Sequence, residues 1–490
     1  MRRLEAAALL LLALSLLRWT RGVHVDDVDA QAYRVLVQHL ADDRAWLGLR
    51  FLPGYWPAFR EHLPFGFWPA ALAARLGGLG AADLLHAVFS LGTLGVLLRA
   101  GRRAFGGSAG LAAALLLALT ESFWRYGGRL LLEPPLLLLA TAAAVPLLVR
   151  PPAKRDLAWA ALFGALACLV KGPFGLAPLC CAGAGRALAE RTSGGTTRLM
   201  ALRLAQTALM ALLAATPVIL FLALDALALH QGFWEGYALR QLRDSAVGAR
   251  HDGVSSTFFV PRVVLGRFWP GLPFALGAAM LSLRTPATQQ QAPGADPRAL
   301  RATALASALL LLALSLPARK WGNHVYVAFP LLALLGGAAL GPLLDRLRAW
   351  AGRPRTLGRL DLVTVSLLTL ALAATGANQL GLGRLLARPP CPLGAGLAEP
   401  LQALPRGDVL VLAPAPDVAL LAAVADETER IPWPVTALPS DPQQREGRPV
   451  VAALVPEGTP PAPGWQQVAQ AAGWALLAPF PRFSGVDDRP

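Results

Sequence analysis

Long apolar blocks, mostly of Leu and Ala, recur throughout residues 1–380 and limit what this chain can fold into. Of the 490 residues, 55% are hydrophobic and only 15% are charged, and the mean hydropathy is +0.48. A soluble chain carries about a quarter charged residues. Apolar blocks of this kind are typical of helices that cross a membrane. The sequence therefore predicts an all-α polytopic membrane protein.

The hydropathy pattern predicts about eleven transmembrane helices, although several segments are shorter than the ~20 residues of a usual span. Segment 65–76 is apolar, short and contains proline, so we expect a helix that lies at the membrane interface. The first apolar run has no small-residue cleavage site, so we expect it to be retained. The expected spans are 6–17, 83–98, 109–123, 130–149, 157–170, 174–188, 204–229, 265–283, 302–316, 326–344 and 360–379.

The basic residues predict the topology. A net charge of +15 is compatible with nucleic-acid binding, but the arginines lie in alternate short loops, as the positive-inside rule requires of cytoplasmic loops. The N-terminus is then cytoplasmic, and an odd number of spans places the C-terminal tail outside the cytoplasm. The basic loops are 99–103, 150–155, 186–203, 284–301 and 346–359.

The composition changes near residue 381, where proline becomes frequent and long apolar runs stop. Short strand-like stretches begin at Asp408, Val450 and Trp474, and VADETER is a possible helix. We therefore expect a transmembrane domain at 1–380 and a small extracytoplasmic α/β domain at 381–490. The four cysteines show no CxxC or Cys/His ligand spacing, so neither a zinc site nor a disulfide framework is expected.

The first extracytoplasmic loop is expected at 21–82 and contains Asp26, Asp27 and Asp29 within four residues. Carboxylates this close to a span are costly to place near lipid. They are either solvating groups of a loop or general bases for an acceptor hydroxyl or amine. The same loop ends in FREHLPFGFWPA, which brings Glu61 and His62 to the membrane face.

Further polar residues are expected on this face. Glu133 begins a predicted span, where it is either a helix N-terminal charge or part of a site. Lys171 lies between two spans and either snorkels or binds phosphate. The remaining candidates are Arg319, Lys320, Asn323, His324 and Tyr326 in one turn, and Arg240, Arg243, Arg250 and His251 in an outer loop. A cation alone is more often an interface anchor, but cations and acids together suit a phosphorylated lipid donor and a base.

The order of these pieces resembles that of the GT-C integral-membrane glycosyltransferases of the protein O-mannosyltransferase and lipid A aminoarabinose transferase type. That family has an acidic motif after the first span, a Lys/His-Pro-Pro-Leu-x-x-Trp motif that ends the first loop, an Arg-Asp pair, a Lys-Gly-Pro and a Lys-Tyr-Pro turn. The matching positions, within roughly residues 1–345, are Asp27, Asp29 and Tyr33; His62, Pro64 and Trp68; Arg129 and Glu133; Lys171, Gly172 and Pro173; and Lys320, Tyr326 and Pro330.

The sequence departs from the family pattern at three places. Ala30 replaces the usual Glu, His62 is followed by Leu63 rather than Pro, and Glu133 replaces Asp. The departures are compatible with a different donor or acceptor and with a weakened enzyme. The resemblance implies a polyprenyl-phosphate sugar as donor, transfer on the periplasmic face of a bacterial inner membrane, inversion at the sugar carbon and an Asp of the first loop as base.

Together these features predict a membrane glycosyltransferase that passes the sugar to a lipid, glycan or protein acceptor. We expect Asp29, or else Asp27, as the catalytic base. The expected substrate-binding residues are Glu61, His62, Glu133, Lys171, Arg243, Lys320 and Tyr326. No metal is expected, because a monophosphate carrier needs less charge neutralisation than a nucleotide diphosphate and the sequence shows no clear metal cluster. No cofactor is expected either. Lys171 and Lys320 are expected to be uncompensated cations, so that their removal would leave the protein level unchanged.

Two other classes are compatible with the sequence. A transporter or lipid flippase would have ionisable or broken helices in paired halves near the bilayer midplane. The charged groups here lie at one face and no internal repeat is evident, which favours an enzyme. A non-catalytic protein that keeps the fold is the third class, and the missing Glu at position 30 leaves it open.

Overall fold

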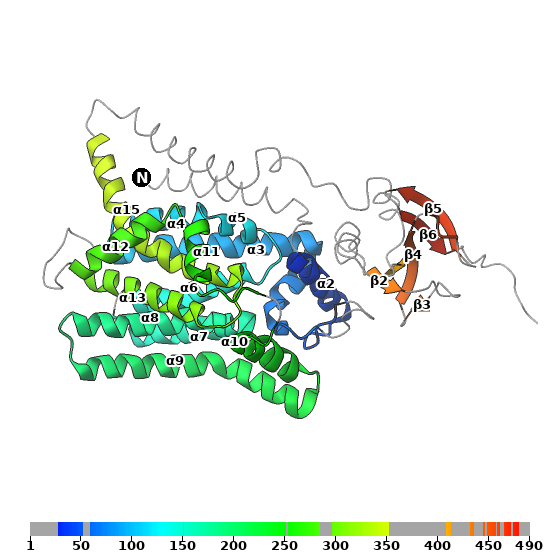
Figure 1. Cartoon of the computed structure of the whole chain (residues 1–490), viewed down its shortest axis with the longest axis horizontal. Coiled ribbons are helices and arrows are strands. Elements are labelled where there is room, and N and C mark those ends of the chain that lie inside the picture. Colours follow the sequence, from blue (N-terminus) through cyan, green and yellow to red (C-terminus); the bar gives the residue numbers. More distant parts are fainter. Residues whose placement is uncertain are drawn as a thin grey trace, which may run out of the picture. The chain divides into compact units, whose positions relative to one another are not determined.

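The structure is a computed structural model. It describes residues 28–51, 59–149, 151–250, 253–284, 296–351 and, further on, 408–412, 432–435, 444–445, 448–456, 458–460, 465–471 and 474–479. The chain forms two compact units (Figure 1). The described parts of one lie within 60–66 and 84–351, and those of the other lie within 21–59, 67–83 and 387–490.

The first unit is helical, because its apolar blocks are long and rich in Leu and Ala, which form helices readily. The helices are α3 (Trp68–Phe105, which begins in the second unit), α4 (Ala109–Ala118), α5 (Glu121–Gly127), α6 (Glu133–Val149), α7 (Lys154–Lys171), α8 (Pro173–Thr192), α9 (Thr197–Leu224), α10 (Asp244–Val247), α11 (Phe259–Arg267), α12 (Leu272–Arg284), α13 (Pro297–Ser315), α14 (Gly322–Val325) and α15 (Phe329–Ala351). Short 3-10 helices are η1 (Pro64–Gly66) and η4 (Tyr326–Ala328), and π-helices are η2 (Asp225–Leu229) and η3 (Trp234–Arg243).

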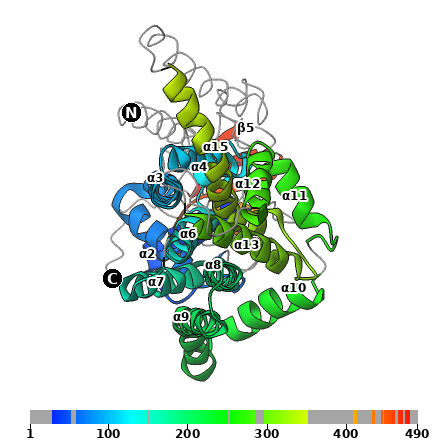
Figure 2. The ribbon, with the colours of Figure 1, turned by 90° about the vertical axis from the view of Figure 1, so that its left-hand side faces the viewer.

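Small residues bring the helices of this unit close together. A Cβ atom built on Gly185 of α8 would lie 2.7 Å from the backbone nitrogen of Ala306 in α13. Gly337 and Gly341, spaced as Gly-xxx-Gly on α15, meet Ala109 of α4 in the same way. Close backbone approach of this kind is common between membrane helices, where van der Waals packing drives association. Figures 1 and 2 show α7, α8 and α9 side by side, lengthwise in one view and end-on in the other.

Four helical segments of the described residues are long and apolar enough to cross a membrane: Trp68–Phe105, Thr197–Leu229, Pro297–Ser315 and Gly322–Arg346. α11 and α12 form a fifth if their 115° bend lies within one span. α4 and α6 are apolar but have only 10 and 17 residues. Two of the expected spans, 6–17 and 360–379, lie outside the described residues. The count of about eleven therefore stays a prediction.

The expected interfacial segment 65–76 begins as η1 and continues as the first part of α3. This helix breaks at Gly77 and Gly78, and Gly78 has a φ of 71° that favours glycine. The predicted end of the segment is therefore confirmed, and its place at the interface stays a prediction.

The second unit contains α2 (Val28–Asp43) and a six-stranded sheet. α2 buries Tyr33, whose ring meets the edges of Phe59 and Phe67 at 6.5 and 5.1 Å between centroids. Arg34 of α2 forms an ion pair with Asp83 at 2.5 Å. These contacts hold together the described parts of the first loop that belong to this unit.

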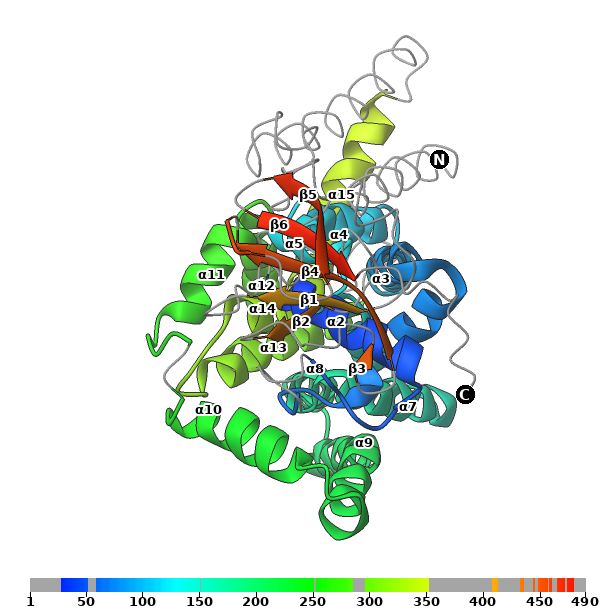
Figure 3. The same cartoon turned by 90° about the vertical axis from the view of Figure 1, so that its right-hand side faces the viewer.

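The sheet has the order β2-β1-β4-β6-β5, with β3 paired to β4 (Figure 3). β1 pairs in parallel with β2 and β4, while β6 pairs antiparallel with β4 and β5. Three strands predicted from the sequence are confirmed as β1, β4 and β6, whereas β5 was not predicted because its WQQVAQA sequence is polar. The strands are β1 (Asp408–Leu412), β2 (Pro432–Val435), β3 (Gln444–Arg445), β4 (Arg448–Pro456), β5 (Trp465–Ala471) and β6 (Trp474–Pro479). The possible helix and the boundary at 380 lie outside the described residues.

Candidate functional site

A buried ion pair joins two of the residues that the sequence singled out. The Lys171 ammonium donates to the Glu133 carboxylate at 2.5 Å, and the Asn323 amide donates to the same Glu133 oxygen at 2.9 Å. Lys171 and Glu133 are only 5% and 3% exposed. A buried carboxylate needs such partners, because burial of an unpaired charge is strongly unfavourable.

The ends of three helices bring these groups together. Glu133 lies in the first turn of α6, where the helix dipole favours a negative charge. Lys171 is the last residue of α7, and Asn323 belongs to the short α14. The two sequence interpretations of Glu133 are therefore compatible, since it is a helix N-terminal acid and also part of the cluster.

This pairing corrects one expectation from the sequence. Lys171 is not an uncompensated cation, because Glu133 neutralises it over a 2.5 Å contact. Its removal would leave a carboxylate buried with one amide partner.

Gly172 forms the turn between α7 and α8 for two reasons. Its φ of 52° and ψ of −126° lie in a region that favours glycine. In addition, a Cβ atom built there would lie 1.9 Å from the hydroxyl oxygen of Tyr237. Pro173 then starts α8, as is common at a first helical position. The Lys-Gly-Pro motif thus ends α7 directly after Lys171 and leaves room for the Tyr237 hydroxyl.

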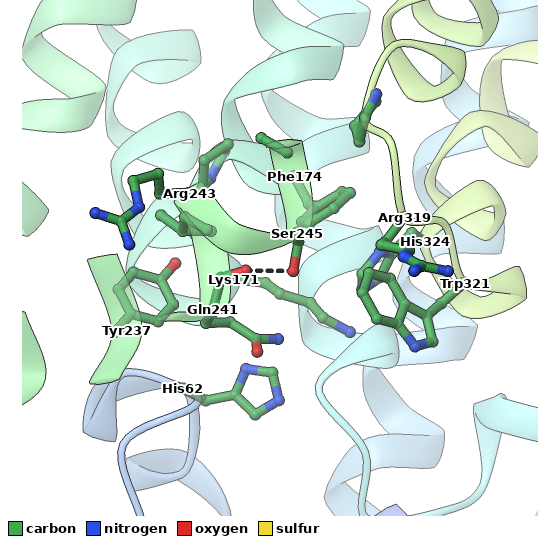
Figure 4. Close-up of a pocket in the computed structure, with 14 residues that line it drawn as sticks. His62, Lys171, Phe174, Tyr237, Gln241, Arg243, Ser245, Arg319, Trp321 and His324 are labelled. Carbon is green, nitrogen blue, oxygen red and sulfur yellow. Dashed lines mark hydrogen bonds between the residues drawn. The ribbon is translucent and has the colours of Figure 1, made fainter. Parts of the chain in front are cut away.

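A cavity of about 380 Å³ opens beside this turn (Figure 4). The cations in its lining are Lys171, Arg243 and Arg319, and the other polar groups include His62, Gln241 and His324. The aromatic part of the lining is Tyr237, Phe174 and Trp321. His324 packs on Phe174 with 4.0 Å between ring centroids and on Trp321 with 5.3 Å. The cavity therefore combines positive charge with aromatic and apolar surface.

His62 enters this cavity from the loop before η1 and is 8% exposed. Burial lowers the pKa of His62 well below its ordinary value of 6.5, and the nearby charges of Lys171 and Arg250 lower this pKa further. At neutral pH the imidazole is therefore uncharged and presents one N–H donor and one acceptor.

Arg250 connects the first loop to the cavity wall. Its guanidinium lies 3.7 Å from the Glu61 carboxylate, donates to the Gln241 side chain and lies over the Trp321 ring at 5.5 Å. Arg243, the arginine chosen from the sequence, pairs instead with its neighbour Asp244 at 2.8 Å and is largely exposed. The outer loop thus supplies Arg243 to the cavity lining and Arg250 to a supporting contact.

The turn before α15 places its residues differently from the expectation. Lys320 is 6% exposed and its backbone bonds to Val254, whereas its neighbours Arg319 and Trp321 line the cavity. A residue and its neighbour in an extended segment point to opposite sides, so a shift of one position exchanges the two cations. Arg319 and not Lys320 therefore lines this cavity, and the role of Lys320 in substrate binding stays a prediction.

Tyr326 is buried behind the cluster. Its ring packs on Tyr126 and Phe329, with 5.6 Å between centroids in each pair. In the described part of the chain its hydroxyl has no hydrogen-bond partner. Tyr126 in turn bonds to Arg267 at 2.8 Å. Tyr326 thus supports the wall around Glu133.

The predicted base Asp29 lies in the first turn of α2, exposed and one turn before the buried Tyr33. An acid in the first turn stabilises a helix through the helix dipole, so the position of Asp29 does not by itself indicate catalysis. Asp26 and Asp27 lie outside the described residues. The assignment of a base among these acids therefore stays a prediction.

One positioning residue was not predicted from the sequence. Asp225 is 1% exposed, and its carboxylate accepts hydrogen bonds from the backbone N–H groups of Gln231 and Phe233 at 3.0 and 2.7 Å. Arg60 donates to the Gln231 carbonyl and lies over the Phe233 ring at 4.6 Å. These contacts fix the start of η3, which supplies Tyr237, Gln241 and Arg243 to the cavity. The sequence contained a signal for this residue, because an acid within an apolar run requires a partner when it is buried.

Comparison with family models and with curated proteins gives no match. Solved structures do match. ArnT from Cupriavidus metallidurans, bound to undecaprenyl phosphate, aligns over 99% of this chain and 98% of its own, with a TM-score of 0.67 and 18% identity. The oligosaccharyltransferase AglB from Archaeoglobus fulgidus, in complex with an inhibitory peptide and a dolichol-phosphate, aligns over 93% and 69%, with a TM-score of 0.54 and 13% identity.

The arabinofuranosyltransferase AftD from Mycobacteria aligns over 98% of this chain and 40% of its own, with a TM-score of 0.51 and 17% identity. The chain has the GT-C fold. The resemblance found in the ordered motifs is thereby confirmed at the level of the fold, over nearly the whole length of ArnT. Together with the apolar helices, the GT-C fold makes the chain a multi-pass membrane protein.

Proposed function

We propose that this chain is a membrane glycosyltransferase that moves a sugar from a polyprenyl-phosphate-linked donor to a lipid, glycan or protein acceptor. The observation that supports it best is the cavity beside Lys171, which combines three cations with aromatic surface in a GT-C fold. ArnT, of the same fold, was crystallised with undecaprenyl phosphate. A carrier of this kind needs both a positive site for its phosphate and apolar surface for its chain.

The donor phosphate would bind among the cavity cations. Glu133 neutralises Lys171 and Asp244 pairs with Arg243, whereas the side chain of Arg319 makes no ion pair within the described residues. Arg319 therefore supplies the net positive charge, and Lys171 and His62 supply directed N–H donors. Hydrogen bonds to a phosphate contribute most when the donor is charged.

The reaction would be a single displacement. The acceptor oxygen or nitrogen attacks the sugar carbon, the bond between that carbon and the phosphate oxygen breaks, and the carrier phosphate leaves with the electron pair. Asp29, or else Asp27, takes the acceptor proton. Cations at the phosphate stabilise the negative charge that develops on the leaving group. No cofactor and no metal enter this scheme.

The proposed orientation rests on the arginine distribution, and the proposed compartment rests on the resemblance to the GT-C family. We propose a bacterial inner-membrane protein with a cytoplasmic N-terminus, a periplasmic active site and the 381–490 domain in the periplasm. Its partners are then membrane lipids, the carrier-linked donor and the acceptor.

A deletion strain tests the proposal. Envelope glycolipids and glycoproteins from this strain are compared with those of the parent by mass spectrometry. The expected result is a product that lacks one sugar mass, restored by a plasmid copy of the gene and not by its Asp29→Asn variant. Unchanged glycan masses with an altered distribution of the lipid carrier across the membrane would instead indicate a flippase.

A further inference from the structure

The hydroxyl of Tyr237 is buried, and no described residue pairs with it. Tyr237 is 2% exposed, and its hydroxyl has no hydrogen-bond partner among the described residues. Burial without a partner destabilises a folded protein, because the group loses its hydrogen bonds to water. Phe at this position would avoid that penalty and keep the packing of the ring. The hydroxyl therefore requires an explanation other than stability.

The ring of Tyr237 lies on the wall of the cavity, with its hydroxyl end on the side of Lys171 (Figure 4). The hydroxyl oxygen lies against the Gly172 turn, so close that a Cβ on Gly172 would meet it at 1.9 Å. Gly172 caps the N-terminus of the 20-residue helix α8, and Pro173 and Phe174 of its first turn line the same cavity. Helix N-termini favour anions through the helix dipole and their unpaired N–H groups.

The wall that carries Tyr237 is held in place. The Asp225 carboxylate accepts from the backbone N–H groups of Phe233 and Trp234, where η3 begins. Ser245 donates to the Gln241 carbonyl at 2.5 Å at the other end of this helix. The hydroxyl is thus presented from a supported element, as a binding group needs to be.

We propose that Tyr237 is a further ligand-binding residue, and that its hydroxyl donates a hydrogen bond to a phosphate oxygen of the polyprenyl-phosphate carrier at the N-terminal end of α8. This rests on the proposed function. Lys171 donates N–H hydrogen bonds to the same oxygens, and the phenol O–H adds a neutral, directed donor. Because the neighbouring Lys171 is already paired with Glu133, a neutral donor adds a hydrogen bond without the cost of another buried charge.

The test compares Tyr237→Phe with the natural protein, each purified as the full chain in detergent. Isothermal titration measures Kd for undecaprenyl phosphate and for undecaprenol, which lacks the phosphate. We expect the variant to bind undecaprenyl phosphate about 10-fold more weakly, to bind undecaprenol equally well, and to have an equal or higher Tm.

Tyr126→Phe is the matched control. It removes the same atom from a hydroxyl that has a partner, Arg267 at 2.8 Å, and that lies outside the cavity lining. Its Tm should fall while its Kd for undecaprenyl phosphate stays unchanged. An unchanged Kd in Tyr237→Phe, or equal losses for both lipids, would overturn the role of Tyr237 alone. If the natural protein does not distinguish undecaprenyl phosphate from undecaprenol, the proposed donor fails as well.

Discussion

At the scale of single residues, the Lys171 and Glu133 pair decides what either side chain can do. Each is isolated in the sequence, yet they meet at 2.5 Å with almost no exposure to solvent. Removal of one partner of a buried pair is far more costly than removal of both.

Lys171→Met should therefore destabilise the protein by about 3–5 kcal/mol, because it leaves the Glu133 carboxylate uncompensated. The double variant Lys171→Met/Glu133→Gln should recover most of this loss, since Gln is neutral, while donor binding stays weak. Thermal unfolding and titration with undecaprenyl phosphate measure the two effects separately. A single variant as stable as the natural protein would contradict the pairing.

Asp29→Asn tests the proposed base. Asn is nearly the same size but cannot accept the proton, so transfer should fall by on the order of 10² to 10⁴ while folding and donor binding survive. Sugar transfer in membranes from a complemented deletion strain measures the loss. Asp27→Asn should cost less and Asp26→Asn least. A dead Asp27→Asn beside an active Asp29→Asn would move the base to position 27, and full transfer in all three would remove this loop from the mechanism.

At the scale of elements, the turn between α7 and α8 positions the charged group and the phenol together. Its glycine has a φ of 52°, and the Tyr237 hydroxyl fills the space that a side chain would occupy. Replacement of Gly172 by a residue with a Cβ atom should therefore cause both backbone strain and a steric clash.

Gly172→Ala should destabilise the protein by more than the about 1–3 kcal/mol of backbone strain alone. Gly194→Ala is the matched control, because Gly194 has a φ of 88° and a Cβ atom built there would meet nothing within 4 Å. Adding Tyr237→Phe to Gly172→Ala should recover the difference between the two variants, since it removes the atom that the new Cβ meets. Thermal unfolding of the four proteins measures this. Equal losses at both glycines would show that the close approach is unimportant.

At the scale of the whole molecule, the arginine-rich loops predict the topology. Reporter fusions should place Gly352 in the cytoplasm and Ser440 outside it, because the expected eleven spans put an odd number before the C-terminal domain. Paired alkaline phosphatase and fluorescent protein fusions at each site measure the compartment. If both fusions report the same compartment, the predicted number of spans is wrong by an odd number.

Local pattern was sufficient for several helices and for three strands. Hydropathy predicted α6, α7 and α8 within a few residues of their bounds, and short apolar runs predicted β1, β4 and β6, because both signals depend on neighbours in the chain. The ordered motifs also indicated the fold class, which the similarity to ArnT confirms. The acid at position 133 and the lysine at position 171 were also identified as candidate site residues from the sequence.

Only the tertiary structure decided which of these groups meet and which are buried. Glu133, Lys171 and Asn323 are separated by up to 190 residues, and their contact depends on how α6, α7 and α14 end beside one another. That Arg319 rather than Lys320 lines the cavity depends on the orientation of the turn that bridges to Val254. Tyr237 and Asp225 were not predicted, because an unpaired hydroxyl or a capped carboxylate is defined by its surroundings in space. Sequence periodicity reports what lies one turn away, whereas charge pairing and burial are set by packing between distant segments.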